Sequence, residues 1–458
     1  MREVTDLLER EDQLATLEAG RERAAEGRGG VMLISGEAGA GKTALVRAFT
    51  SRLADGHRLL WGMCDDLVIP RPLGPFRDIA TEAPALAEAI SGHDQGQILD
   101  AVIEELAAKP SPVVAVVEDA QWADEATVDL IGFLGRRVDR LTALIIVTYR
   151  DVGTPLDHPL RQTLGKIPTA NLTRIAVGPL SRAAVAELAG TADVDDLYRL
   201  SRGNPLYVTE LLRSSDGVPA PVHEAVMARL GRLTSTARAC VEVAAVVPHG
   251  AEEWLLVSCG VGEGLEEAQM AGFLHRSGEL FEFSHELTRR VVEDHLGARR
   301  RRECHEAVLS ALSGRDEDPA RLAHHAFQAG DTRAVARFSP LAARRAVAFH
   351  GHPEAREHYR QALSSPDQFP VEERATLLEE YATECLLTSH LEEAGAALER
   401  AISLREKGDV DRLGADLTLL SEVRWAQARG SEAEKAALRA VETLEERGVD
   451  PAVDEAGN

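Results

Sequence analysis

The residues with the clearest chemistry form the run Gly36-Glu37-Ala38-Gly39-Ala40-Gly41-Lys42-Thr43. It fits the pattern G-x-x-x-x-G-K-[ST], in which glycines let successive backbone N–H groups point inward around an anion. The lysine adds a mobile charge for the β- and γ-phosphates, and the threonine hydroxyl can bind Mg²⁺. An apolar stretch, Val31–Ser35, precedes the run and a helical stretch, Thr43–Leu53, follows it, as this chemistry requires. We predict a polyphosphate-binding loop made of Gly36, Ala38, Gly39, Ala40, Gly41, Lys42, Thr43 and Ala44; the alternatives are a degenerate loop or a glycine-rich turn that binds nothing.

Two acids, Glu118 and Asp119, follow the apolar run Val113–Val117. A nucleotide site of this kind needs a carboxylate at a strand end to hold the metal directly or through water. We expect Glu118 and Thr43 on the Mg²⁺ side and Asp119 polarising the attacking water. The more usual order is Asp followed by Asp or Glu, so Glu118 at the metal position is a departure. The alternative is a pair of solvated acids after a buried strand.

A further cation, Arg150, ends the apolar run Leu144–Tyr149. From a neighbouring strand its guanidinium could reach a γ-phosphate and stabilise the charge that develops there. The alternative is an exposed arginine at a strand end. Trp122, close to the acids, is interpreted as a packing residue rather than a chemical one.

The elements that position these residues form an alternation of strands and helices, typical of a parallel βαβ sheet. The expected strands are Val31–Ser35, Arg58–Gly62, Val113–Val117 and Leu144–Tyr149. Apolar and polar residues do not strictly alternate in them, as is typical of a sheet that is covered on both faces. Beyond Ser181 only Phe281–His285 reads as a strand, and the rest is mainly helical. The predicted fold class is an α/β P-loop NTPase domain followed by all-α, winged-helix and helical-repeat domains.

An internal repeat appears late in the chain. Ala355, Ala394 and Ala433 are spaced 39 residues apart, and each is followed at the same distance by a small residue and a larger one. These pairs are Ala362–Leu363, Ala401–Ile402 and Ala440–Val441. Such spacing favours an array of helical hairpins, the alternative being chance register in an alanine-rich chain. Polar, Gly- and Pro-rich stretches predict breaks at Ser214–His223 and Ser313–Pro319.

Composition excludes several classes of protein. The 458 residues, 44% hydrophobic and 28% charged, can build several packed domains, so wholesale disorder is excluded. A formal charge of −24 repels nucleic acid, so DNA contact would need a separate basic module. Five scattered cysteines are expected to be reduced, and neither a signal peptide nor an apolar run of ~20 residues is present. We therefore expect a cytoplasmic protein with no membrane contact.

Many segments in order resemble the STAND class of signal-transducing P-loop ATPases, and most of all the N-terminal half of large LuxR-type, maltose-activator-like bacterial transcriptional regulators. The segments are GEAGAGKTAL, WGMC with PRPLGPFRDIA, VEDAQWADEATVDL, VTYRD, GPLSRAAVAEL, SRGNPLYVTELL, FEFSHELTRRVVEDHL and LAHHAFQAGD. The resemblance implies an AAA-like ATPase part followed along the chain by a sensor part. These are a P-loop αβ domain (1–178), a small helical domain (179–215), a winged-helix domain (222–312), tetratricopeptide-like repeats (319–446) and a frayed tail (447–458).

In such proteins ADP holds a closed form, exchange for ATP drives oligomerisation, and slow hydrolysis resets the switch. By resemblance, Pro205 lies against the nucleotide, and Arg10, in Glu9-Arg10-Glu11 where the family usually has Gly-Arg-Glu, contacts its adenine side. His285 takes the position from which a winged-helix histidine senses the diphosphate. Taken without the family, a lone histidine after a strand is more often a satisfied structural residue.

The leading function is thus an ATP/ADP-operated switch with Mg²⁺, expected to be a weak ATPase, that couples a signal at the helical repeats to self-assembly. Its expected partners are adenine nucleotide, an unknown inducer or protein at the repeats, and further copies in an ATP-dependent homo-oligomer. No helix-turn-helix DNA reader is recognisable. The basic run Arg299–Arg302 is interpreted as a solvated or acid-paired helix face; the alternatives are contact with the nucleotide-binding domain or a neighbouring subunit, and contact with nucleic acid. The rival is a helical-repeat interaction scaffold with a relict nucleotide site. A P-loop transferase is disfavoured because no acceptor-site residues follow the acidic strand.

Overall fold

The computed structural model describes residues 7–53, 58–109, 112–151, 158–190, 193–213, 222–315, 317–406 and 412–445. The chain divides into two compact units, residues 1–316 and 317–458. This boundary falls inside the predicted break at 313–319. The break expected at 214–223 lies almost entirely outside the described residues, and the tail predicted at 447–458 lies wholly outside them. Among the described helices, none combines the length and the apolar character needed to cross a membrane.

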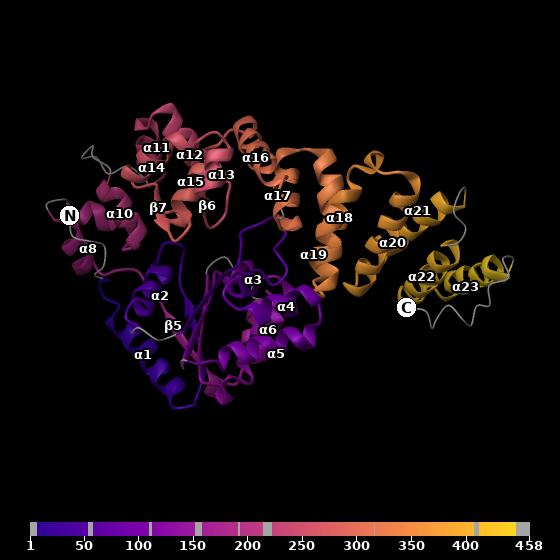
Figure 1. The fold of residues 1–458 in the computed structure, drawn as a ribbon, viewed down its shortest axis with the longest axis horizontal. Coiled ribbons are helices and arrows are strands. Elements are labelled where there is room, and N and C mark those ends of the chain that lie inside the picture. Colours follow the sequence, from indigo (N-terminus) through magenta and orange to yellow (C-terminus); the bar gives the residue numbers. More distant parts are fainter. Residues whose placement is uncertain are drawn as a thin grey trace. The chain divides into compact units, whose positions relative to one another are not determined.

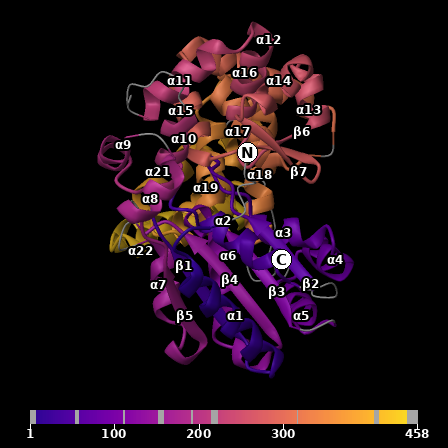
Figure 2. The ribbon, with the colours of Figure 1, turned by 90° about the vertical axis from the view of Figure 1, so that its left-hand side faces the viewer.

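The first unit is built on a five-stranded parallel sheet (Figure 1), in which the strand order is β2-β3-β4-β1-β5 (Figure 2). The strands are β1 (Gly30–Ser35), β2 (Arg58–Met63), β3 (Val113–Glu118), β4 (Ala143–Tyr149) and β5 (Leu172–Ala176). In register, Ser35 pairs with Tyr149 and Met63 with Glu118. The segments that follow β1, β3 and β4 therefore leave the sheet at one edge, which is where the predicted chemistry lies.

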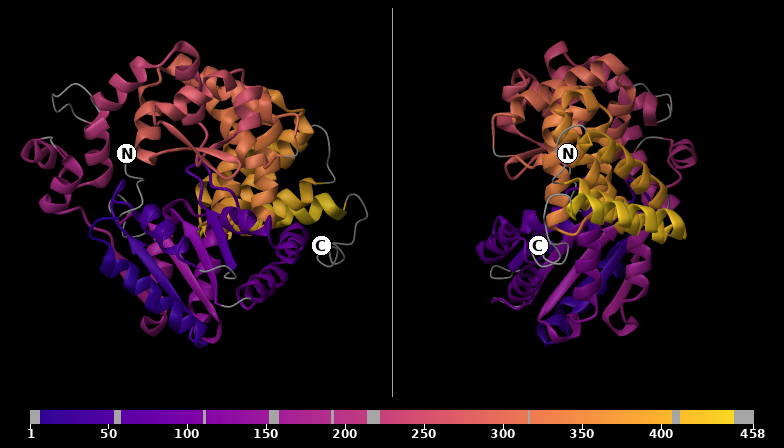
Figure 3. Two further views of the ribbon diagram at one scale, coloured as in Figure 1. Left: turned by 60° about the vertical axis from the view of Figure 1, so that its left-hand side comes forward. Right: turned by 90° about the vertical axis from the view of Figure 1, so that its right-hand side faces the viewer.

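Helices cover both faces of this sheet, as the views in Figures 2 and 3 show. On one face Val114 and Val116 pack with α1 and α2 in a single apolar core. On the other face the alternate residues Ala115 and Val117 line a cavity together with residues of α3, α4, α5 and α6. The helices are α1 (Glu11–Ala25), α2 (Lys42–Thr50), α3 (Gly74–Ala80), α4 (Pro84–Gly92), α5 (Gln95–Leu106), α6 (Glu125–Gly135) and α7 (Pro159–Gly165). The expectation of buried parallel strands is confirmed.

The four expected strands of the sheet are confirmed within one residue at each end, but the fifth strand was not predicted. β5 has the sequence LTRIA, and only Ile175 on it is buried, because it lies at the edge of the sheet. The expectation of a single strand after residue 181 is wrong as well. Phe281–His285 contains β8 (Leu280–Phe283), and two more short strands, β6 (Ala251–Glu252) and β7 (Leu274–Ser277), flank β8 in an antiparallel sheet.

Helices make up the rest of the first unit. They are α8 (Arg182–Ala189), α9 (Val194–Ser201), α10 (Pro205–Arg213), α11 (Val222–Arg232), α12 (Ser235–Ala245), α13 (Glu253–Ser258), α14 (Leu265–Met270), α15 (Glu286–His295) and α16 (Ala298–Leu312). The basic run lies on α16, where Arg300 pairs with Glu242 and Glu303. These ion pairs agree with the prediction that the basic run forms a solvated or acid-paired helix face.

The second unit contains only helices over the residues that are described, and each helix packs on the next one in the chain. They are α17 (Pro319–Ala329), α18 (Thr332–Ala348), α19 (His352–Leu363), α20 (Val371–Leu387), α21 (Leu391–Arg405), α22 (Leu413–Ala426) and α23 (Gly430–Glu445). The repeated alanines Ala355, Ala394 and Ala433 lie on α19, α21 and α23, and all three are buried. A small side chain at this position lets each of these helices approach its neighbour closely, which is the packing that the repeat predicted.

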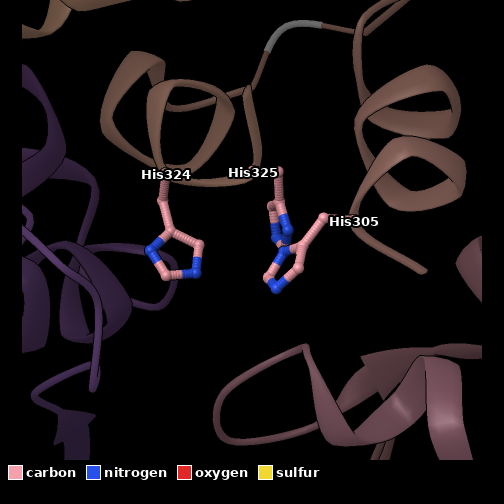
Figure 4. A group of neighbouring side chains, drawn as sticks. All are labelled: His305, His324 and His325. Carbon is pink, nitrogen blue, oxygen red and sulfur yellow. The ribbon is translucent and has the colours of Figure 1, made fainter. Parts of the chain in front are cut away.

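Two buried polar features mark the core of the second unit. The rings of His324 and His325 on α17 meet edge to face with 5.1 Å between their centroids, as the close-up in Figure 4 shows. The fully buried guanidinium of Arg405 bonds to Asp416 and Glu379. Burial raises the pKa of Asp416 to about 6, a rise that Arg405 opposes. The charged side chains of Glu379, Arg405 and Asp416 thus join α20, α21 and α22, in addition to their apolar contacts.

Candidate nucleotide-binding site

The predicted phosphate loop connects β1 to α2 at the edge where the parallel strands end. A Cβ atom on Gly36 would lie 2.6 Å from the carbonyl oxygen of Val177, so only glycine fits there. Gly41 has a φ of +95°, which a side chain would strain, and it places the first turn of α2 directly after the loop. Thr43 and Ala44 begin this helix exposed to solvent. The N–H groups of the helix start are thus available to an anion.

Lys42 is the electrostatic centre of the loop. Its Nζ donates hydrogen bonds to the carbonyl oxygens of Gly36 at 2.9 Å and Glu37 at 3.1 Å. Burial lowers the pKa of Lys42, while the charges of Asp119 and Glu118 oppose that fall. Arg150 also lies close enough to act on the same ammonium. The structure therefore brings together all three residues predicted to be catalytic around the predicted phosphate-binding lysine.

Glu118 ends β3 with its carboxylate buried. Neither carboxylate oxygen has a hydrogen-bond partner among the described residues. Burial and the neighbouring charge of Asp119 raise its pKa to about 7, and the Thr43 hydroxyl opposes the rise. A buried carboxylate that makes no hydrogen bond of good geometry and lies near a hydroxyl oxygen suits a hard divalent cation. Glu118 and Thr43 thus fit the predicted Mg²⁺ position, and the role stays a prediction.

Asp119 turns the chain sharply away from β3. Its φ of +51° is in the left-handed region, and its N–H donates to Thr148 Oγ1 at 2.9 Å. Gln121 Nε2 donates to Asp119 Oδ1, while the backbone N–H of Arg150 donates to Gln121 Oε1, both at 2.9 Å. Gln121 therefore ties the second acid to the strand end that carries the arginine. Sequence reasoning missed it, because nothing in a lone glutamine next to the acids indicates this bridge.

The helical segment after the sheet contacts the loop through Asn204. Its Nδ2 donates to the carbonyl oxygen of Ala38 at 2.9 Å, and the N–H of Leu206 reaches the carbonyl of Gly39 at 3.4 Å. Pro205, predicted to contact nucleotide, lies between them as the first residue of α10. The contact of Pro205 with nucleotide stays a prediction, and the hydrogen bond from Asn204 to the loop was not predicted.

Arg10, just before α1, is buried against the same loop. Its Nη2 donates to the carbonyl oxygen of Gly178 at 2.6 Å and reaches that of Ala40 at 3.5 Å. Burial lowers the pKa of Arg10, a fall that Glu9 opposes. These contacts give Arg10 a structural role at the loop, and its adenine-side role stays a prediction.

His285 lies directly before α15, and its carbonyl oxygen accepts from the N–H groups of Thr288 and Arg289. Its predicted role as a sensor stays a prediction. Ion pairs join this helix to the loop after β2, because Asp66 Oδ2 lies 2.6 Å from Arg290 and 3.4 Å from Arg289. We call Asp66, Arg289 and Arg290 the α15 latch.

A further ion pair connects α2 to the antiparallel sheet of the first unit. Arg47 on α2 meets Glu282 on β8 at 2.8 Å, one turn beyond Thr43. No local pattern could have predicted this pair or the α15 latch, since their partners lie more than 200 residues apart.

The buried carboxyl of Glu118 predicts a pH effect on stability. Its pKa is about 7 in the folded chain against an ordinary 4.5, so the folded state keeps a proton that the unfolded state loses between these values. Stability should therefore fall as the pH rises from about 4.5 to 7. Glu118→Gln should remove that loss and be more stable than the natural protein at pH 8 by on the order of 3 kcal/mol. Urea unfolding at pH 5 and pH 8 measures this gap.

The control is internal to the comparison. Asp124, whose pKa burial raises to about 6, is present in both proteins, so its contribution cancels. A pH dependence that is unchanged by Glu118→Gln would contradict the assignment of an ionisable, unpaired carboxyl to position 118.

Comparisons with known proteins cover the sheet domain and the chain as a whole. Residues 6–147 match the family described as the AAA ATPase domain. An uncharacterized protein of Rhizobium meliloti (strain 1021) is 23% identical over 411 residues, covering 71% of this chain and 39% of the relative. The chain thus spans about two fifths of the length of that curated relative.

Solved structures with similar folds include a signal transduction ATPase with numerous domains (STAND) and a tetratricopeptide repeat sensor, from Pyrococcus horikoshii. It has a TM-score of 0.50 and 13% identity over 94% of this chain and 77% of that chain. A Walker-type ATPase of Pyrococcus abyssi has a TM-score of 0.34 and 14% identity over 63% of this chain and 97% of its own. The fold is therefore that of a P-loop NTPase, with a helical region after it, and the predicted fold class is confirmed.

Proposed function

We propose that this chain binds ATP and ADP and acts as a signal-transducing switch of the STAND type, as the sensor and ATPase part of a LuxR-type transcriptional regulator. One observation carries the proposal. Glu118, Asp119 and Arg150 all lie within electrostatic reach of Lys42, at the edge of the sheet where the phosphate loop begins. A loop that served only to stiffen the fold would not need two acids and a second cation around one buried ammonium.

In this proposal each side chain has one role in hydrolysis. Lys42 pairs with β- and γ-phosphate oxygens, and the N–H groups at the start of α2 hold the same oxygens. Thr43 and Glu118 would hold Mg²⁺, which would offset phosphate charge when bound. Asp119 orients the attacking water, and Arg150 stabilises charge on the γ-phosphate. Slow turnover suits a switch that must remain in its active state.

The contacts around the loop support a switch rather than a plain ATPase. Asn204 joins the loop to α10, the α15 latch joins α15 to the loop after β2, and Arg47 joins α2 to β8. We propose that these segments form the helical and winged-helix domains, with Pro205 and His285 facing the nucleotide. Exchange of ADP for ATP would then be read as a change in these contacts, with an inducer acting at the helical repeats and self-association as the output.

The deciding experiment is calorimetry on the full chain with ADP and with ATP in the presence of Mg²⁺, joined to sedimentation velocity in each nucleotide. Binding of both nucleotides, with a larger assembly in ATP, is the expected result. If neither ADP nor ATP binds, the proposal is overturned and the helical-repeat interaction scaffold becomes the better-supported function.

A further inference from the structure

Trp122 lies between two arginines that come from different parts of the first unit. It is the last residue of the short helix η1 (Ala120–Trp122), directly after the two acids. The guanidinium of Arg150, at the end of β4, is 5.9 Å from its ring centroid, and that of Arg290, on α15, is 5.3 Å away. Both distances are within the ~6 Å over which a cation is attracted to an aromatic face, and indole is the most favourable ring.

The backbone around the ring is fixed on the side of the site. The N–H of Trp122 donates to the carbonyl oxygen of Asp119 at 2.9 Å, and Gln121 bridges the Asp119 carboxylate and the N–H of Arg150. The start of the Arg150 side chain is therefore held at a set distance from the indole. The Arg150 guanidinium, at the far end of this side chain, is the group proposed to reach the γ-phosphate.

The second arginine depends on how α15 is held. Arg290 Nη2 pairs with Asp66 at 2.6 Å and its Nε with Glu286 at 3.3 Å. Its contact with the indole is therefore present together with the closed α15 latch. The indole of Trp122 thus lies within cation–π distance of both Arg150 of the candidate site and Arg290 of the α15 latch.

We propose that Trp122 is a positioning residue that holds the Arg150 guanidinium over its indole while α15 is docked, and so couples the latch to the availability of Arg150 for the γ-phosphate. The inference rests on the proposed function, since it assigns a regulation to that same site. Only the γ-phosphate distinguishes ATP from ADP, so a change in Arg150 should alter ATP affinity and leave ADP affinity nearly constant. Trp122 therefore sets the preference between the two nucleotides.

The test measures the ratio of ATP to ADP affinity by calorimetry with Mg²⁺ on the full chain. Trp122→Leu removes the aromatic face beside Arg150 and should shift the ratio toward ATP by about three- to tenfold, the size of one cation–π contact. Trp122→Phe keeps an aromatic face and should restore most of the natural ratio. Arg150→Gln should shift the ratio toward ADP, and the double variant Trp122→Leu with Arg150→Gln should match Arg150→Gln alone.

The pattern of results separates this proposal from simple packing. Equal weakening of ATP and ADP by Trp122→Leu, or a Trp122→Leu shift that persists when Arg150 is absent, would overturn it while the nucleotide switch stands. Failure of the natural protein to bind either nucleotide would overturn the proposed function and this inference together. If Trp122→Leu does not fold, as judged by circular dichroism, Trp122→Met carries the same expectations.

Discussion

Replacing Lys42 with alanine should abolish measurable ATP and ADP binding. The ammonium is the one lysine charge at the phosphate loop, and its Nζ already lies within hydrogen-bond distance of the loop carbonyls of Gly36 and Glu37. Charged hydrogen bonds to β- and γ-phosphates contribute about 1.5–3 kcal/mol each, so losing two of them weakens binding about a hundredfold or more. Fluorescent nucleotide titration in Mg²⁺ measures the loss, and sedimentation shows whether ATP-dependent assembly is lost with it.

The control for this variant is Lys166→Ala, which removes an exposed lysine at the end of α7. Thermal unfolding without nucleotide should show that both variants are folded. Nucleotide binding by Lys42→Ala at the natural affinity would contradict the site. Loss of binding with unchanged assembly would instead favour a scaffold whose association does not depend on nucleotide.

Reversing the charge of Asp66 should open the α15 latch. In Asp66→Arg a cation replaces the carboxylate that lies 2.6 Å from Arg290 and 3.4 Å from Arg289. Two attractive contacts become repulsive, and the buried position of Arg289 leaves little water to screen them. We expect ADP to be released about ten- to a hundredfold faster, because each charged contact of this kind contributes about 1.5–3 kcal/mol. Stopped-flow displacement of a fluorescent ADP measures the rate.

Two further variants control for effects unrelated to the latch. Asp100→Arg makes the same charge change at an exposed position on α5 and should leave ADP release unchanged. Adding Arg290→Asp to Asp66→Arg restores one pair of opposite charges and should recover part of the natural rate. If all of these proteins release ADP at one rate, the contacts of α15 do not control the nucleotide.

The parts of the fold that sequence could predict are those recorded in local patterns. The apolar runs before Gly36, Glu118 and Arg150 identified three strands, and the glycine spacing identified the loop between β1 and α2. Placing the carboxyl ends of parallel strands at one edge then brought the acids, the lysine and the arginine together. The 39-residue repeat predicted closely packed helices, because a buried alanine recurs wherever two helix backbones must approach.

The parts that could not be predicted depend on contacts between distant segments. The edge strand β5 is short and carries Thr173 and Arg174, so its apolar content is too low to stand out. The α15 latch joins residues more than 200 positions apart, each ordinary in its own segment. Asn204 and Gln121 act through single hydrogen bonds to backbone groups, which no spacing rule records. Trp122 was assigned to packing, and the two cations at its ring became visible only in three dimensions.

The backbone at the end of β3 makes the two adjacent acids non-equivalent. Position 119 has a φ of +51°, which aspartate and asparagine tolerate better than longer side chains do. Position 118 is enclosed, and a shorter acid there would withdraw its oxygens by one methylene from the Thr43 side. Exchanging the order of these acids would therefore demand a different chain path at this corner. The Glu-Asp order and the shape of the turn therefore depend on each other.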